Sequence, residues 1–218
     1  MGWATLINLF EMEGLIELHY IPSIAYFVVL HRCDTVVIER HENFVKQTYR
    51  NRCVINTSQG LSRLVVPLTS RHGKVLITDI KIDHSQKWLN NHWRAIRSAY
   101  ARAPFFEHYA DALHDTLFRQ HVFLYDLNME LLTICLKWLK LSVTIVESSR
   151  YIPEVSEEFF DLRHVIHPKN PLPGKVGFKE VQYAQVFGSK FVPNLSIIDL
   201  VFCEGPSARH VVESSAGT

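Results

Sequence analysis

The sequence predicts an α/β fold, in which a mixed sheet is flanked by helices, and leaves an α+β arrangement as the alternative. One observation is the opening, where an apolar run at 15–18 precedes an apolar helical segment at 24–30 and the β-branched run 35–38. The other is a later stretch whose apolar residues recur at helical spacing, namely Leu89, Trp93, Ile96 and Tyr100. Because strand–helix–strand units usually join parallel strands by a right-handed crossover, we expect the sheet to begin with a parallel pair.

Turn residues and apolar periodicity predict the remaining elements. A hairpin is expected from 52–55 and 61–68, because the intervening TSQG suits a turn. Further helices are expected at 85–101, with Ser85 as the N-cap, and at 106–119, 122–140 and 193–202. A buried strand is expected at 143–146, whereas residues 151–182, rich in Pro, Lys and His, are expected to be largely irregular.

Length and composition fit one folded domain. The chain has 218 residues, of which 47% are hydrophobic and 21% charged, enough to build a packed core. We expect residues 1–13 to be an N-terminal extension, 14–206 the domain, and the small, polar stretch 207–218 a flexible tail. The formal net charge of +1 argues against a dedicated nucleic-acid binder, which would carry a strong basic excess.

Cysteine usage and the start of the chain predict a cytoplasmic protein. The four cysteines are widely spaced and form no CxxC pair, which is typical of reduced thiols. The apolar start lacks the basic residues of a signal peptide and is too short to span a bilayer, so no membrane span is expected.

Polar chemistry is concentrated in residues 39–53, directly after a predicted buried strand. This segment holds Lys46, Tyr49, Arg50, Asn51 and Arg52. Arg presents a planar fork to a carboxylate or phosphate and Lys a point charge, and ligands of open α/β sheets bind beyond the carboxyl ends of strands. The segment therefore predicts an anion-binding loop, with a solvated charged loop as the alternative.

Histidines supply the candidates for proton transfer. His41, with Glu42 beside it as an orienting group, is the first candidate base, and His92 is the second; each also fits an ordinary surface or core residue. His164 and His167 lack a second ligand pair at zinc spacing, so no metal site is predicted. The sequence contains no HExxH, GxSxG or Gly-rich phosphate loop, which argues against the common hydrolase and NTPase mechanisms and leaves any cofactor unknown.

In order along the chain, these segments resemble the WbqC-like protein family from about residue 15 to residue 206. The ordered set carries the resemblance rather than any one piece. It comprises Tyr20-Ile21-Pro22 with Tyr26-Phe27, Asp34, Lys46 with Arg50-Asn51-Arg52, Val66-Pro67, Asp83 with Trp88, His92-Trp93 and Tyr100, Pro104-Phe105-Phe106, Asn128, Ser148-Ser149, Tyr183-Ala184-Gln185-Val186-Phe187 and the closing PNLSIIDLVFCEG. His19 stands where many members have Gln, and the stretch between Ser149 and Tyr183 is short.

The resemblance implies a cytoplasmic acyl or aminoacyl transferase that forms an amide on an amino sugar in O-antigen or other surface-polysaccharide synthesis. Its partners would be small molecules, either a nucleotide-linked amino sugar or an acyl thioester donor. The resemblance strengthens the assignment of function to the basic loop and adds Tyr183, Gln185 and Asp199 as candidate substrate-binding residues. A non-catalytic module that binds a glycan or a partner protein, and a nucleotidyl or adenylate-forming transferase, are the alternatives.

Overall fold

The computed structural model describes residues 13–69, 73–155, 159–169, 177–188 and 190–217, so the predicted extension lies almost wholly outside the described residues. A sheet in the order β5-β2-β1-β6 forms its centre, and every neighbouring pair in it is parallel. The strands are Glu13–Ile16 (β1), Thr35–Ile38 (β2), Thr144–Glu147 (β5) and Phe159–Asp161 (β6). With a separate antiparallel hairpin, the fold is α/β, as the sequence predicts.

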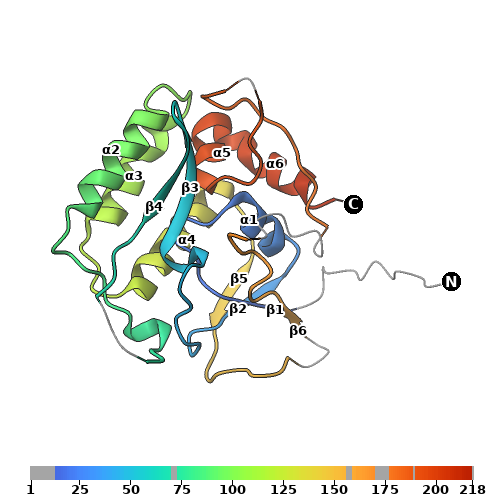
Figure 1. Cartoon of the computed structure of the whole chain (residues 1–218). Coiled ribbons are helices and arrows are strands. Elements are labelled where there is room, and N and C mark those ends of the chain that lie inside the picture. The colour runs from blue at the N-terminus through green and yellow to red at the C-terminus, as the bar shows by residue number, and fades with distance from the viewer. Residues whose placement is uncertain (1–12, 70–72, 156–158, 170–176, 189, 218) are drawn as a thin grey trace.

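Helix α1 (Ile24–His31) joins β1 to β2 and is buried along nearly its whole length. Its sequence IAYFVVLH has almost no polar face, so other elements must cover it. Two C-terminal helices, α5 (Ile197–Glu204) and α6 (Ala208–Ser215), contact α1 on this side of the molecule (Figure 1). The backbone N–H of Ala25 donates to Oδ1 of Asn194 at 2.8 Å, which satisfies the start of the helix.

Strand β1 fits tightly between its neighbours at Gly14. A Cβ atom there would lie 2.7 Å from Cδ1 of Leu162 and 2.9 Å from Sγ of Cys33. Both distances are well below ordinary van der Waals contact, so β1 can occupy this place only because residue 14 has no side chain.

The hairpin stands beside the sheet and connects it to three longer helices. It consists of β3 (Arg52–Thr57) and β4 (Gly60–Val65), close to the predicted ranges. Helix α2 (Trp88–Tyr100) contacts β3, and α3 (Phe106–Phe118) and α4 (Leu124–Leu139) follow in the same layer of the molecule (Figure 1). Short 3-10 turns at Tyr49–Asn51 and Ile77–Asp79 flank the hairpin in the chain.

Two predictions about local structure are wrong at helix ends. The stretch from 207 is not a flexible tail, because α6 buries Ala208, Val211, Val212 and Ser215, which share one helical face. Ser85 does not cap α2, because this helix begins only at Trp88. The N–H and the hydroxyl of Ser85 both donate to the Asp83 side chain in a turn.

The sequence prediction also missed β6, which lies inside the stretch expected to be largely irregular. Its three residues pair with β1 from Glu13↔Phe159 to Leu15↔Asp161. A strand this short carries no readable alternation, and only the partner strand defines it. Within the described residues, no helix has the length and apolar character needed to cross a membrane.

Candidate functional site

The carboxyl ends of the parallel strands bring together polar residues that are far apart in the sequence. Glu17 follows β1, Glu39 follows β2, Ser148 follows β5, and Arg163 and His164 follow β6. The chain builds β1, β2 and β5 outward and then returns to place β6 on the other side of β1. Ligands of open α/β sheets bind where the strand order reverses in this way, outside the carboxyl ends.

Arg50, predicted to contact a ligand, is instead buried at this edge. Its Nε and Nη2 donate to the two carboxylate oxygens of Glu42 at 2.7 and 2.5 Å, and its Nη1 lies 3.5 Å from Oε1 of Glu17. The side chain has 0% exposure, and the Asn128 side chain donates to its backbone carbonyl at 2.8 Å. Arg50 therefore neutralises two buried carboxylates and holds the 42–50 segment to α4 and β1.

Burial and pairing set the charge states around Arg50. Burial alone would raise the pKa of Glu17, but the hydrogen bond and charge of His19 and the charge of Arg50 lower it to about 2. Burial also raises the pKa of Glu42, against the opposing effect of Arg50. Burial lowers the pKa of His19, against the opposing hydrogen bond and charge of Glu17.

Glu39 ties three chain segments together. Its carboxylate accepts from the Ser148 hydroxyl at 2.7 Å, from the His41 backbone N–H at 2.9 Å and from the Ile152 N–H at 3.0 Å. The predicted base His41 is thus held through its backbone, with a side chain of intermediate exposure. It lines neither of the two pockets described next.

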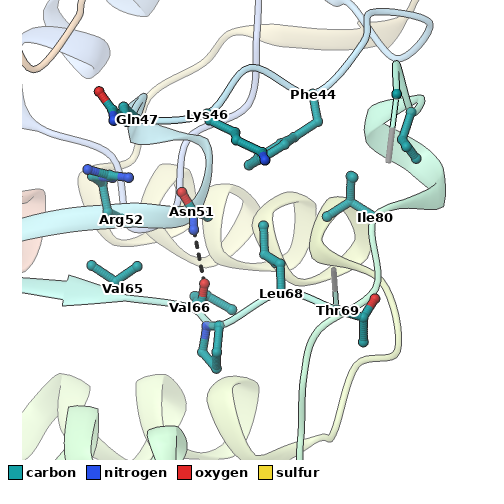
Figure 2. Close-up of a pocket in the computed structure, with 13 residues that line it drawn as sticks. Phe44, Lys46, Gln47, Asn51, Arg52, Val65, Val66, Leu68, Thr69 and Ile80 are labelled. Carbon is teal, nitrogen blue, oxygen red and sulfur yellow. Dashed lines mark hydrogen bonds between the residues drawn. The ribbon is translucent and has the colours of Figure 1, made fainter. Parts of the chain in front are cut away.

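The first pocket, called the hairpin pocket, is a cavity of about 490 Å³ beside the start of β3 and the end of β4. Its wall is largely apolar and carries the predicted residues Lys46, Asn51 and Arg52; the full lining is Phe44, Lys46, Gln47, Asn51, Arg52, Val65, Val66, Pro67, Leu68, Thr69, Gly73, Val75 and Ile80. In Figure 2 the Lys46 side chain extends toward Phe44, with its amino group above Leu68.

Two polar atoms of the hairpin pocket have no hydrogen-bond partner among the described residues. The Asn51 side chain donates to the Val66 carbonyl at 3.0 Å, but its buried Oδ1 has no donor (Figure 2). The Nε of Arg52 is likewise buried and unpaired. Leaving buried polar groups unpaired is costly, so Oδ1 of Asn51 and Nε of Arg52 have hydrogen-bonding capacity that a water molecule or a ligand can use.

The second pocket, called the sheet-edge pocket, is a cavity of about 290 Å³ at the carboxyl ends of the parallel strands. It is lined by Glu42, Asn43, Val45, Tyr151, Asp161, Arg163 and His164. Phe44, Lys46 and Gln47 line the hairpin pocket, so one chain segment, residues 42–47, contributes a wall to both pockets.

Two other predicted residues lie in the core beside these pockets. His92 is 5% exposed, and its Nδ1 lies 2.9 Å from the Tyr20 hydroxyl. Burial lowers the pKa of His92 to about 4, so its imidazole is neutral at pH 7. Tyr49 is buried as well, with its ring centroid 5.5 Å from that of His19. Neither His92 nor Tyr49 lines the hairpin pocket or the sheet-edge pocket.

Tyr183, Gln185 and Asp199 come together, but in a separate network. The Tyr183 and Tyr100 hydroxyls donate to the two Asp199 oxygens at 2.6 and 2.8 Å, and burial raises the pKa of Asp199. The Gln185 side chain donates to the Val192 carbonyl at 2.8 Å and accepts from the Val192 N–H at 2.9 Å. These hydrogen bonds hold Tyr183, Gln185 and Val192 to α5. Neither pocket has any of these residues in its lining.

Sequence reasoning missed the end of β6 and the residues that follow it. Asp161, Arg163 and His164 reach the sheet edge only because β6 pairs with β1, and β6 itself carries no clear signal. Glu17 carried a usable signal, because it is a charged residue inside the apolar run predicted at 15–18. Among the described residues, no three His, Cys, Asp or Glu side chains are grouped so that they could hold a metal ion.

Comparison with known proteins gives a family but no function. The model of the WbqC-like protein family matches residues 18–169 and 175–211, most of the chain. "Uncharacterized protein Rv1507c" of Mycobacterium tuberculosis (strain ATCC 25618 / H37Rv) is 29% identical over 224 residues, which cover 89% of this chain and 94% of the relative. No solved structure matches significantly.

Proposed function

Since this chain belongs to the WbqC-like protein family, we propose that it is a cytoplasmic transferase that joins an acyl or aminoacyl group to the amine of a sugar. The product would be an amide-bearing sugar for O-antigen or other surface-polysaccharide assembly. The described cysteines, Cys33, Cys53, Cys135 and Cys203, are free thiols, which supports a reducing compartment.

The hairpin pocket carries this proposal, because its chemistry suits the donor. Lys46 and Arg52 offer positive charge to phosphates, whereas the Arg50 charge is already taken by carboxylates. Apolar side chains such as Val66 and Leu68 form the rest of the wall, and the unpaired Oδ1 of Asn51 requires an N–H or O–H donor. An acyl thioester on a phosphopantetheine arm has all three parts: phosphates, a slender apolar chain and amide N–H groups.

The reaction is an aminolysis that the bound geometry would promote. The neutral sugar amine attacks the thioester carbonyl carbon, the C–N bond forms, the C–S bond breaks, and the proton released by nitrogen ends on the departing thiolate. The atoms and electrons of this reaction balance without an oxidant or a metal ion. Holding both substrates in one site can contribute about 7–11 kcal/mol to such a step, so a covalent enzyme intermediate is not needed.

Thermal melting against a ligand panel tests the proposal. The panel contains acetyl-coenzyme A, coenzyme A, a nucleotide-linked amino sugar, ATP and glycine. A ligand at a hundred times its dissociation constant adds roughly 2.7 kcal/mol of stability, which a melting curve resolves. We expect acetyl-coenzyme A to stabilise the wild type and the matched controls Lys137→Ala and Arg97→Ala, whose exposed side chains lie on α4 and α2.

The variants Lys46→Ala and Arg52→Ala should melt like the wild type without ligand and gain little from the thioester. A shift with ATP alone would favour nucleotidyl transfer over acyl transfer. If nothing on the panel shifts the wild type, the transferase proposal fails and a module that binds a partner becomes the better explanation.

A further inference from the structure

His164 has the strongest claim to chemistry outside the hairpin pocket. It follows β6, lines the sheet-edge pocket and keeps 55% of its side chain exposed. The pocket lies where the strand order reverses between β1 and β6, the usual ligand position in an open α/β sheet. A titratable imidazole is therefore presented at a position that the fold makes accessible to a ligand.

The backbone at His164 is held in an uncommon conformation. Its φ of 61° is in the left-handed region, which a residue with a side chain seldom adopts. The His164 N–H donates to the Glu17 carboxylate, at 3.2 Å to Oε1 and 3.1 Å to Oε2. Because Glu17 is itself buried against Arg50, these hydrogen bonds anchor the loop to the interior. A strained backbone conformation that the surrounding structure holds in place is typical of functional sites.

Charge at the sheet edge opposes a phosphate and favours an ammonium group. Four carboxylates, those of Glu17, Glu39, Glu42 and Asp161, form ion pairs with the two guanidinium groups of Arg50 and Arg163, and Glu17 also lies near the rings of His19 and His164. The Asp161 carboxylate accepts from Nε and Nη2 of Arg163 at 2.9 and 2.8 Å, but it keeps 43% exposure on the pocket rim, so its remaining lone pairs are open to a second donor. The hairpin pocket has the opposite character, with Lys46 and Arg52 and no carboxylate in its lining.

We propose that the sheet-edge pocket binds the acceptor amine between Asp161 and His164, and that His164 accepts the proton which the attacking nitrogen releases. This inference rests on the proposed transfer to an amine. Nitrogen forms its bond to the acyl carbon, loses its proton to the imidazole, and the imidazolium returns that proton to the thiolate. Residues 42–47 contribute to the walls of both pockets, and the side chains of Val45 and Lys46 on that segment are exposed.

Ligand-observed NMR with D-glucosamine and D-glucose tests the amine site without any donor. The two sugars differ in one group, so selective binding reports the amine. The ring-proton signals of His164, assigned with His164→Gln, should move when glucosamine binds and stay in place with glucose. The other titratable groups that face His164 are Glu17, His19, Glu42, Asp161 and His167.

Variants locate the binding and the proton transfer. We expect Asp161→Asn to weaken glucosamine binding about tenfold, a loss of about 1.4 kcal/mol, while the exposed control Asp126→Asn binds as the wild type does. His164→Gln should keep glucosamine binding within threefold and lower amide formation on the order of a hundredfold, the usual worth of a general base. His210→Gln, on the exposed side of α6, should change neither.

Equal binding of both sugars, no binding, unchanged His164 ring-proton signals, or full glucosamine binding in Asp161→Asn would overturn this inference. The outcome is separable from that of the donor proposal. Loss of thioester binding with glucosamine binding retained would contradict only the hairpin-pocket assignment, and the reverse result would contradict only the acceptor site.

Discussion

Arg50 and Arg52 lie two residues apart and have opposite surroundings. Arg50 is wholly buried and forms ion pairs with Glu42 and Glu17, whereas Arg52 lines the hairpin pocket and has no ion pair with a carboxylate among the described residues. The same difference separates the two regions they belong to, an interior held by matched charges and a pocket whose charges are unmatched. A cation can recruit an anionic ligand only where the protein has not already supplied its partner.

The largest effect is expected from removing the matched charge. Arg50→Ala leaves the Glu17 and Glu42 carboxylates buried without their counter-charge, and breaking a buried pair in this way costs about 3–5 kcal/mol. Urea unfolding should show the loss, with Arg97→Ala on the exposed face of α2 as the control. An Arg50→Ala protein as stable as the wild type would contradict the structural role given to Arg50.

A smaller loss is expected where β1 meets its neighbours. In Gly14→Val the new side chain overlaps Leu162 and Cys33, and overpacking of this kind costs about 1–3 kcal/mol. Denaturant unfolding measures it. Gly73→Val offers a comparison, because no atom lies within 4 Å of a Cβ at Gly73, although its φ of 84° adds backbone strain.

Lowering the pH should destabilise the fold through His92. Its pKa is about 4 in the folded protein and about 6.5 when unfolded, so the unfolded chain binds more protons between these values. The stability contribution is complete above pH 6.5 and falls toward pH 4, by about 2 kcal/mol between pH 7 and pH 5. Urea unfolding at both pH values should give a shallower dependence for His92→Gln than for the wild type, and identical slopes would refute this assignment.

The smallest stability effect is expected at the pocket cations. Lys46 is exposed and pairs with no carboxylate in the described residues, so Lys46→Ala should change the free energy of unfolding by no more than about 0.5 kcal/mol. The affinity of the Lys46→Ala protein for coenzyme A should nevertheless be about tenfold lower than that of the wild type. Calorimetric titration and urea unfolding of the same preparation separate the two quantities, and a large stability loss would place Lys46 among the structural charges.

Apolar periodicity was sufficient to predict most of the fold. The β-branched run at β2, the turn between β3 and β4, and the stripe on α2 are local patterns that a sequence carries by itself. Strand β6 and helix α6 were missed for different reasons. The three residues of β6 become a strand only by pairing with β1, and the apolar face of α6 was hidden in a stretch of small and polar residues.

The candidate site was predictable only as a segment. Lys46, Asn51 and Arg52 do line a pocket, but nothing local distinguishes Arg52 from Arg50. That distinction depends on how the segment folds, because Glu42 pairs with Nε and Nη2 of Arg50 while Glu17, distant in sequence, lies 3.5 Å from its Nη1. His164 depends in the same way on β6, so long-range strand pairing determines which charged residues can meet a ligand.

The dissociation constant of acetyl-coenzyme A for the wild type, Arg52→Ala and Arg97→Ala tests the central claim most directly. We expect equal binding by the wild type and Arg97→Ala and at least about tenfold weaker binding by Arg52→Ala, with unchanged unfolding curves for all three. Binding by Arg52→Ala that equals the wild type would contradict the claim that the unpaired charges of the hairpin pocket hold the donor.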